Sequence, residues 1–171
     1  MCGIVGYVGH QQALGVVLAG LRRLEYRGYD SAGVAVLTGD ELATERKAGR
    51  LANLEAELDR LGRDGFVGTA GMGHTRWATH GAPVDRNSHP HRDTSGRVAV
   101  VHNGIIENFA ALRRELEADG VEMSSDTDTE TAAHLIAKAY ESGETAGDLP
   151  ASVRAVCRRL DGAFTLVVTH A

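Results

Sequence analysis

Apolar side chains recur along the chain with two spacings, which predict strands and helices. The run Ile4-Val5-Gly6-Tyr7-Val8 is short and rich in β-branched and aromatic residues, which indicates a strand. The apolar residues that follow lie three and four positions apart, as on one face of a helix: Leu14, Val17, Leu18, Leu21 and Leu24. We expect this helix to end before Arg27-Gly28.

The rest of the chain continues this pattern. Short strands over 32–37 and 42–46 flank the turn signal Thr38-Gly39-Asp40 and predict a hairpin. A second helical stripe consists of Leu51, Leu54, Leu58 and Leu61. Further strands are predicted near 69–75, 98–101, 121–123 and 164–168, and helices near 109–118, 130–141 and 151–160. No repeat or low-complexity linker interrupts the pattern, so we expect one domain in which helices sandwich sheets.

Composition and charge narrow the class of protein. A chain of 171 residues with 43% hydrophobic and 24% charged residues is typical of one soluble globular domain. The net charge of −5 argues against a general nucleic-acid binder, and no apolar stretch is long enough to span a membrane. Two cysteines cannot form a disulfide framework for a domain of this size. We therefore predict a cytoplasmic protein with neither nucleic-acid nor membrane partners.

Glycine is the one residue type in clear excess. The chain has 21 glycines, where an average usage of about 7% predicts about 12. Glycine is used where the backbone turns sharply or approaches a ligand closely. Five of these glycines lie in the polar segments 25–33, 73–81 and 102–108 at the ends of predicted elements. We expect the chemistry of the protein in these three segments and in the polar segment 125–130.

Cys2 is the residue whose position suggests the most chemistry. Removal of Met1 would leave Cys2 with a free α-amine beside its thiol. A free amine has a pKa of about 7.7–8.0 and a thiol about 8.5, so at neutral pH the amine can accept the thiol proton and produce a nucleophile. The alternative interpretation is that Cys2 is a small buried residue opening a strand.

A thiolate that attacks an amide needs donors for the oxyanion that forms. Asn103-Gly104 can supply a side-chain amide and a backbone N–H for this purpose. If the substrate is a free amino acid, Arg76 can bind its carboxylate and Asp128 its ammonium group. Each residue also has a structural alternative: Asn-Gly is a common turn, and an arginine often pairs with a surface carboxylate. Asp128 would lie in the first turn of a helix with a capping box formed by Thr127 and Glu130.

Several motifs occur together in one order along the chain. They are Cys2-Gly3-Ile4-Val5-Gly6-Tyr7, the segments 25–33 and 73–81, His89-Pro90-His91, the segment 102–108 and Thr127-Asp128-Thr129-Glu130. In this combination the sequence closely resembles the glutaminase domain of the glutamine–fructose-6-phosphate aminotransferase (glucosamine-6-phosphate synthase) family, over essentially the whole chain. Related amidotransferases share the cysteine, the Asn-Gly pair and the arginine, but differ in the segments 25–33 and 73–81.

The resemblance implies a fold and a mechanism. The fold is the N-terminal-nucleophile hydrolase fold of the α+β class, a four-layer αββα sandwich with Cys2 at the end of a central strand. Cys2 would attack the side-chain amide of L-glutamine, release ammonia and form a γ-glutamyl thioester that water hydrolyses, without a cofactor. Asn103 and the N–H of Gly104 would form the oxyanion hole. The resemblance also implies that the substrate-binding residues are Arg76, Trp77, Thr79, His80, His89 and Asp128. Trp77 would in addition gate the passage of ammonia.

The resemblance also bears on domain organisation. Residues 1–171 would form a glutaminase domain, truncated at its C-terminal end, because the family continues into more glutaminase sequence and then into sugar-isomerase domains. Fructose 6-phosphate would be a partner only through those isomerase domains, which are absent from this chain. The full-length enzyme would be a homo-oligomer.

Three alternatives remain open at this stage. The chain could be the glutaminase domain of another class II amidotransferase. It could be a metal-binding module, because four histidines lie close in sequence: His80, His89, His91 and His102. It could also be a non-catalytic binding module with the same fold, which would tolerate loss of Cys2.

Overall fold

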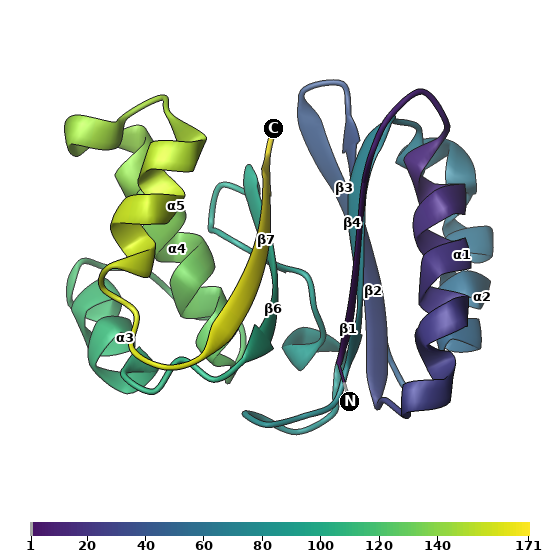
Figure 1. Ribbon diagram of the computed structural model, residues 1–171, viewed down its shortest axis with the longest axis horizontal. Coiled ribbons are helices and arrows are strands. Elements are labelled where there is room, and N and C mark those ends of the chain that lie inside the picture. Colours follow the sequence, from purple (N-terminus) through teal and green to yellow (C-terminus); the bar gives the residue numbers. More distant parts are fainter. Residues whose placement is uncertain (1) are drawn as a thin grey trace.

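The computed structural model describes residues 2–171. Two antiparallel sheets lie face to face between two layers of helices (Figure 1). The strand order is β1-β4-β2-β3 in the first sheet and β5-β6-β7 in the second. The expected α+β class and four-layer αββα arrangement are therefore confirmed. The expectation that Met1 is removed concerns a residue outside the described part of the chain.

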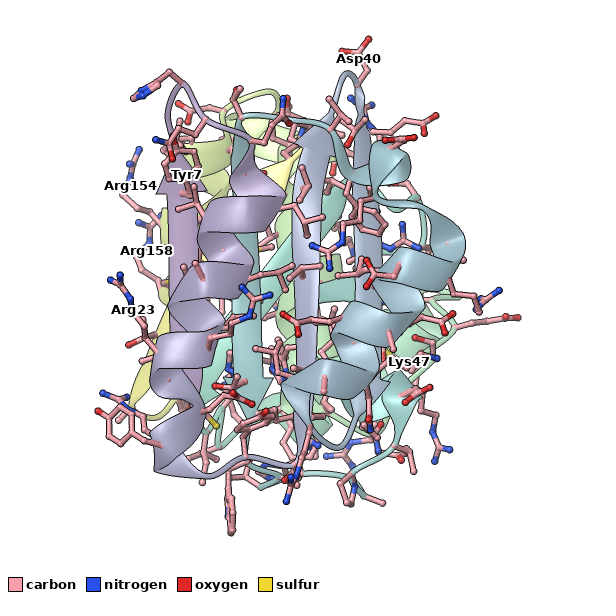
Figure 2. The ribbon with its side chains drawn as sticks, turned by 90° about the vertical axis from the view of Figure 1, so that its right-hand side faces the viewer. Tyr7, Arg23, Asp40, Lys47, Arg154 and Arg158 are labelled. Carbon is pink, nitrogen blue, oxygen red and sulfur yellow. The ribbon has the colours of Figure 1, made fainter. Side chains whose placement is uncertain are left out.

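The first sheet and its helices come from the N-terminal half of the chain. The strands are β1 (Gly3–Val8), β2 (Ser31–Thr38), β3 (Glu41–Ala48) and β4 (Ala70–Arg76), and the helices are α1 (Ala13–Leu24) and α2 (Leu51–Leu61). Figure 2 shows α1 and α2 side by side over the sheet, with Asp40 at the tip of the β2–β3 hairpin. Both apolar stripes are buried against the sheet, as their spacing predicted, except at their last positions, where Leu24 is half-buried and Leu61 is exposed.

The second sheet and its helices come from the C-terminal half. The strands are β5 (His91–Arg92), β6 (Val98–Gly104) and β7 (Phe164–His170), and the helices are α3 (Phe109–Ala118), α4 (Asp128–Glu141) and α5 (Leu149–Cys157). Short 3-10 helices lie in the connections of both halves of the chain: η1 (Glu25–Arg27), η2 (Arg63–Phe66), η3 (Asp85–Asn87) and η4 (Gly143–Thr145). A second apolar core lies between this sheet and its helices.

A third, smaller core joins the two sheets. It consists of buried side chains from both facing surfaces: Ala35, Leu42, Met72, Ala99 and Val101. Strand β2 is covered by helices on one face and by the second sheet on the other, so Ser31 to Val36 are all buried. This double burial explains why β2 shows a continuous run of small and apolar residues rather than alternation.

The predicted strand at 121–123 is wrong. The N–H of Val121 donates to the carbonyl oxygen of Leu116 and so closes the end of α3. The N–H of Ser124 donates to the side chain of Glu130 in α4. Because helix ends take up these backbone groups, no sheet edge is needed. The apolar side chains of Val121 and Met123 pack instead on the core beneath α3 and α4.

Other predicted boundaries shift by a few residues. Helix α4 begins at Asp128 rather than Glu130, and α5 spans Leu149–Cys157 rather than 151–160. The two-residue strand β5 was not predicted, because two residues carry no periodicity. Among residues 2–171, no helix has the length and apolar character needed to cross a bilayer.

Gly33 shows how tightly the segment before β5 packs on the first sheet. A Cβ atom added to Gly33 would lie 2.0 Å from the carbonyl oxygen of His89 and 2.8 Å from Cβ of Arg46. Backbone atoms cannot yield as a flexible side chain can. The close approach therefore requires glycine at this position of β2.

We predict that Gly33→Ala lowers the free energy of unfolding by about 1–3 kcal/mol, the usual cost of overpacking a core. Gly15→Ala is the matched control, because Gly15 lies exposed in α1 with nothing within 4 Å of an added Cβ. It should stabilise the helix by about 0.5–1 kcal/mol. Urea denaturation of both variants measures the two effects, and an unchanged midpoint for Gly33→Ala would contradict the packing argument.

Candidate active site

A cavity of about 250 Å³ lies where β1 begins and where β4 and β6 end. In Figure 1 the start of β1 and the end of β4 are at the lower edge, beside the N label. The cavity brings together seven of the nine predicted site residues, leaving out Asn103 and His80. Its lining residues are Cys2, Arg76, Trp77, Thr79, His89, His102, Gly104, Ile105 and Asp128.

Strand pairing places Cys2 next to the last residue of β4 and the residue that follows it. β1 and β4 are antiparallel, with Gly3 opposite Thr75, so Cys2 lies beside Arg76 and Trp77. The backbone N–H of Trp77 donates to Sγ of Cys2 at 3.1 Å. Sγ also lies 3.6 Å from the carbonyl oxygen of Trp77, to which the thiol donates. The sulfur is thus positioned at the cavity wall with a donor already directed at it.

Arg76 presents a buried cation to the cavity. Its side chain is 3% exposed, and Nη2 donates to the carbonyl oxygens of His80 and Gly81. Nη1 lies 4.0 Å from Oδ1 of Asp30 and has no hydrogen-bond partner among residues 2–171. Burial lowers the pKa of Arg76, while Asp30, Cys2 and Asp128 act in the opposite direction. A guanidinium with one unused NH₂ group is suited to a carboxylate ligand.

Asp30 was not among the predicted site residues, although it lies in the segment 25–33. Its N–H donates to the carbonyl oxygen of Arg76 at 2.7 Å, and its Oδ2 accepts from the N–H of Ala78 at 2.5 Å. These contacts hold both sides of the turn that follows β4. Asp30 therefore positions the loop that carries Trp77 and Thr79.

Asp128 presents a buried anion from the first turn of α4. Oδ2 accepts from the N–H of Ile106 at 3.0 Å, and Oδ1 lies 3.8 Å from Nδ1 of His102. The cap of this helix is Thr127, whose Oγ1 accepts from the N–H of Glu130. The predicted cap is therefore correct for Thr127, and the Asp128 carboxylate is free of that role.

The second hydrogen bond of the predicted capping box, from the N–H of Thr127 to the side chain of Glu130, is absent. The side chain of Glu130 accepts hydrogen bonds from Ser124 and Ser125 rather than from the N–H of Thr127. That N–H donates to Oγ of Ser125 instead. Glu130 thereby ties the segment before α4 to the helix, which fixes the position of Asp128.

Two buried imidazoles form another part of the cavity wall. Nε2 of His89 and Nδ1 of His102 both hydrogen-bond Oγ1 of Thr129, at 2.7 and 2.9 Å. Burial lowers the pKa of both rings, so both are neutral at pH 7. His91 lies behind them, where its ring nitrogens contact Arg46 and Thr127. In the described part of the chain, no three His, Cys, Asp or Glu side chains converge as metal ligands do.

Asn103 and Gly104 end strand β6 rather than forming a turn. Gly104 pairs with Phe164 of β7, so the turn alternative for Asn-Gly is wrong. Gly104 has φ +122°, and an added Cβ would lie 2.2 Å from the carbonyl oxygen of Ala163. Oδ1 of Asn103 is hydrogen-bonded to Nε2 of His74 at 2.7 Å. Asn103 itself is half-buried beside the cavity.

The loop after β4 carries the remaining predicted residues. Thr79 lines the cavity, whereas the ring of His80 packs edge-on against Phe109 with the ring centroids 4.9 Å apart. Nδ1 of His80 lies 3.9 Å from Oδ2 of Asp128. The Trp77 side chain is 55% exposed, at the rim of the cavity.

Sequence reasoning missed several residues that shape this site. His74, His102 and Thr129 lie within the polar segments already singled out, but nothing in their spacing shows which neighbours they meet. The cavity that they surround holds a thiol, a guanidinium and a carboxylate. This combination is complementary to an amino acid that carries a reactive group on its side chain.

Comparison with known proteins agrees with this chemistry. The glutamine amidotransferase domain family matches residues 74–171, more than half of the chain. The whole chain is 67% identical to a glutamine–fructose-6-phosphate aminotransferase (isomerizing) of Mycolicibacterium paratuberculosis and 65% identical to one of Mycolicibacterium smegmatis. The chain spans 28% of the length of each of these two relatives.

A solved structure supports the fold. Glutamine phosphoribosylpyrophosphate amidotransferase from B. subtilis, complexed with ADP and GMP, superimposes with a TM-score of 0.80 at 26% identity, over 99% of this chain and 35% of that one. The expected N-terminal-nucleophile hydrolase fold is therefore confirmed. Taken with the match over residues 74–171, this likeness shows that the chain belongs to the glutamine amidotransferase domain family.

Proposed function

We propose that this chain hydrolyses the side-chain amide of L-glutamine and supplies the ammonia to a synthase reaction. The observation that carries the proposal is the single cavity shared by Cys2, Arg76 and Asp128. A glutamine molecule has a carboxylate, an ammonium group and a side-chain amide, and the three side chains correspond to these groups one by one. The non-catalytic alternative would give no reason for a sulfur with an N–H directed at it.

The proposed nucleophile is Sγ of Cys2, once the residue preceding it has been removed. The free α-amine takes the thiol proton, and the thiolate adds to the side-chain carbonyl carbon of glutamine. The resulting tetrahedral intermediate collapses as the amide nitrogen accepts a proton and leaves as ammonia. Water then attacks the γ-glutamyl thioester, which releases glutamate and restores the thiol.

Asn103 and Gly104 are the proposed donors to the oxyanion. The side-chain amide of Asn103 and the N–H of Gly104 lie at the end of β6, where the strand reaches the cavity. Such donors act most strongly when they are held in place before charge develops, and removing one costs about 3–4 kcal/mol of transition-state stabilisation.

Substrate recognition rests on opposite charges from different elements. Arg76 of β4 would bind the glutamine carboxylate and Asp128 of α4 its ammonium group. Thr79, His80 and His89 would complete the walls around the substrate, and exposed Trp77 would control the passage of ammonia out of the cavity.

We further propose that residues 1–171 are the glutaminase part of a glutamine–fructose-6-phosphate aminotransferase. Identity of 67% over the whole chain, against 26% for the phosphoribosylpyrophosphate amidotransferase, favours this member of the family. The ammonia would then convert fructose 6-phosphate into glucosamine 6-phosphate at isomerase domains outside this sequence. The longer enzyme would act in the cytoplasm as a homo-oligomer.

We predict that glutamine hydrolysis requires removal of Met1. An acylated nitrogen on Cys2 cannot act as a base, and the extra residue adds bulk at the nucleophile. Protein treated with methionine aminopeptidase should therefore hydrolyse glutamine, whereas protein that retains Met1 should be at least about 100-fold slower, in line with the contribution of a general base. Intact mass defines each preparation. Equal rates would exclude the N-terminal amine as the base.

Variants of the two charged residues test recognition. Arg76→Lys keeps the charge but loses the fork of donors, and Asp128→Asn keeps the shape but loses the charge. Each should lower kcat/KM for glutamine by about 10- to 100-fold, since hydrogen bonds to charged groups contribute about 1.5–3 kcal/mol. The measurement is initial-rate glutamate release over a range of glutamine concentrations.

Thr127→Ala is the matched control for Asp128→Asn. It removes the cap of α4 and should lower the free energy of unfolding by about 1 kcal/mol. Its KM for glutamine should remain close to that of the parent protein. If Asp128→Asn instead reproduces the control, with lower stability and intact glutamine kinetics, Asp128 has no part in recognition.

The 171-residue chain should carry out hydrolysis without synthesis. The proposed nucleophile, oxyanion donors and charged clamps all lie within residues 2–128, whereas the proposed sugar-phosphate site belongs to isomerase domains outside this sequence. Purified protein should release glutamate and ammonia in equal amounts, and fructose 6-phosphate should neither accelerate hydrolysis nor be converted. Separate assays of glutamate and amino sugar check this. Formation of amino sugar would contradict the division of roles.

A further inference from the structure

The proposed oxyanion hole requires Asn103 in one of two orientations. A carboxamide has a donor end, the NH₂ group, and an acceptor end, the oxygen, and the two have nearly the same shape. Only the donor end can stabilise an oxyanion. If the amide were turned by 180°, the oxygen would face the developing negative charge and oppose the reaction. Some contact must therefore select the orientation.

His74 makes that contact. Its Nε2 lies 2.7 Å from Oδ1 of Asn103, across the interface between β4 and β6. A carboxamide oxygen only accepts hydrogen bonds, so Nε2 must carry the ring proton. His74 is fully buried, which keeps water from replacing it as the partner of Oδ1. The donor end of Asn103 then remains available to the substrate.

The surroundings of His74 keep its ring in this state. Burial lowers its pKa to about 4, so the ring is neutral and has a single N–H. Nδ1 makes no hydrogen bond of good geometry among residues 2–171, although the backbone of His102 approaches the ring and acts to raise its pKa. A proton on Nδ1 would be a buried donor without a well-aligned acceptor, which proteins avoid more strictly than an unused acceptor. The ring of His89 lies against that of His74, with centroids 4.5 Å apart, and restricts its rotation.

We propose that His74 is a positioning residue for glutamine hydrolysis, which acts by holding the Asn103 amide with its donor end toward the oxyanion. The inference rests on the proposed function, because it matters only if Asn103 is an oxyanion donor. His74 is fully buried and its Nε2 is bonded to Asn103, so it acts through Asn103 rather than on the substrate. Its effect should therefore appear in kcat rather than in KM.

The test is a double-mutant cycle between His74 and Asn103. Asn103→Ala should lower kcat by about 100-fold or more. His74→Phe keeps a ring but removes the donor, and should lower kcat by about 10-fold with KM changed less than about threefold. In the Asn103→Ala background, His74→Phe should cost less than about twofold more, because it acts through the residue already lost. His74→Gln offers an N–H again and should recover part of kcat.

His91→Phe is the matched control. It removes an equally buried ring, 4.9 Å from His89, whose hydrogen bonds go to Arg46 and Thr127. Any loss of kcat that it causes should be the same factor in both backgrounds, as expected for residues without shared partners. Melting temperatures of all variants separate losses of structure from losses of rate.

The tautomer of His74 gives a second measurement that needs no folded variant. Nitrogen-15 chemical shifts of labelled histidine in the parent protein should show a proton on Nε2 of His74, and a proton on Nδ1 would overturn the proposal. Equal losses of kcat from His74→Phe in the parent and in the Asn103→Ala background would also overturn it. So would an unchanged kcat in the His74→Phe single variant when Asn103→Ala is slow. If Asn103→Ala is itself fully active, the oxyanion assignment fails, and the role of His74 fails with it.

Discussion

The antiparallel pairing of β1 with β4 is the constraint on which the site depends. With Gly3 opposite Thr75, the residue before β1 meets the residues that end β4, and Cys2 lies against the N–H of Trp77. Side chains alternate along a strand, so a slip of β1 by one residue would turn Cys2 away from the face that it shares with Arg76. The register is held by apolar side chains on both faces of the sheet, in the cores under α1 and α2 and between the sheets.

The second requirement is to keep charged and polar side chains buried at the end of this sheet. Burying an ion is costly unless hydrogen bonds replace its water. Arg76 donates to the carbonyl oxygens of the following loop, and Asp128 accepts from the N–H of Ile106. These partners come from backbone, so the cation and the anion need not neutralise each other. Nη1 of Arg76 has no hydrogen-bond partner among residues 2–171, and both charged side chains line the cavity in which we propose that glutamine binds.

Much of the scaffold was predictable from local pattern. The leucine stripes of α1 and α2 and the hairpin at Thr38-Gly39-Asp40 follow from periodicity and turn chemistry, which depend on near neighbours. The strand predicted at 121–123 fails because its apolar residues pack under helices whose ends take up the backbone groups. The motifs also identified most of the cavity lining, since nucleophile, cation and anion are recognisable as residue types.

The sequence by itself therefore determined which side chains are candidates for the chemistry, and the tertiary structure decided how each is held. Cys2, Arg76 and Asp128 stand out because few residue types can do what they do. The hydrogen bond from Ile106 to Asp128 and the contact of His74 Nε2 with Asn103 both join segments that are far apart in the chain. Such contacts do not appear as a periodic pattern in the sequence, because a buried histidine is the same residue type whether it fills space or orients an amide.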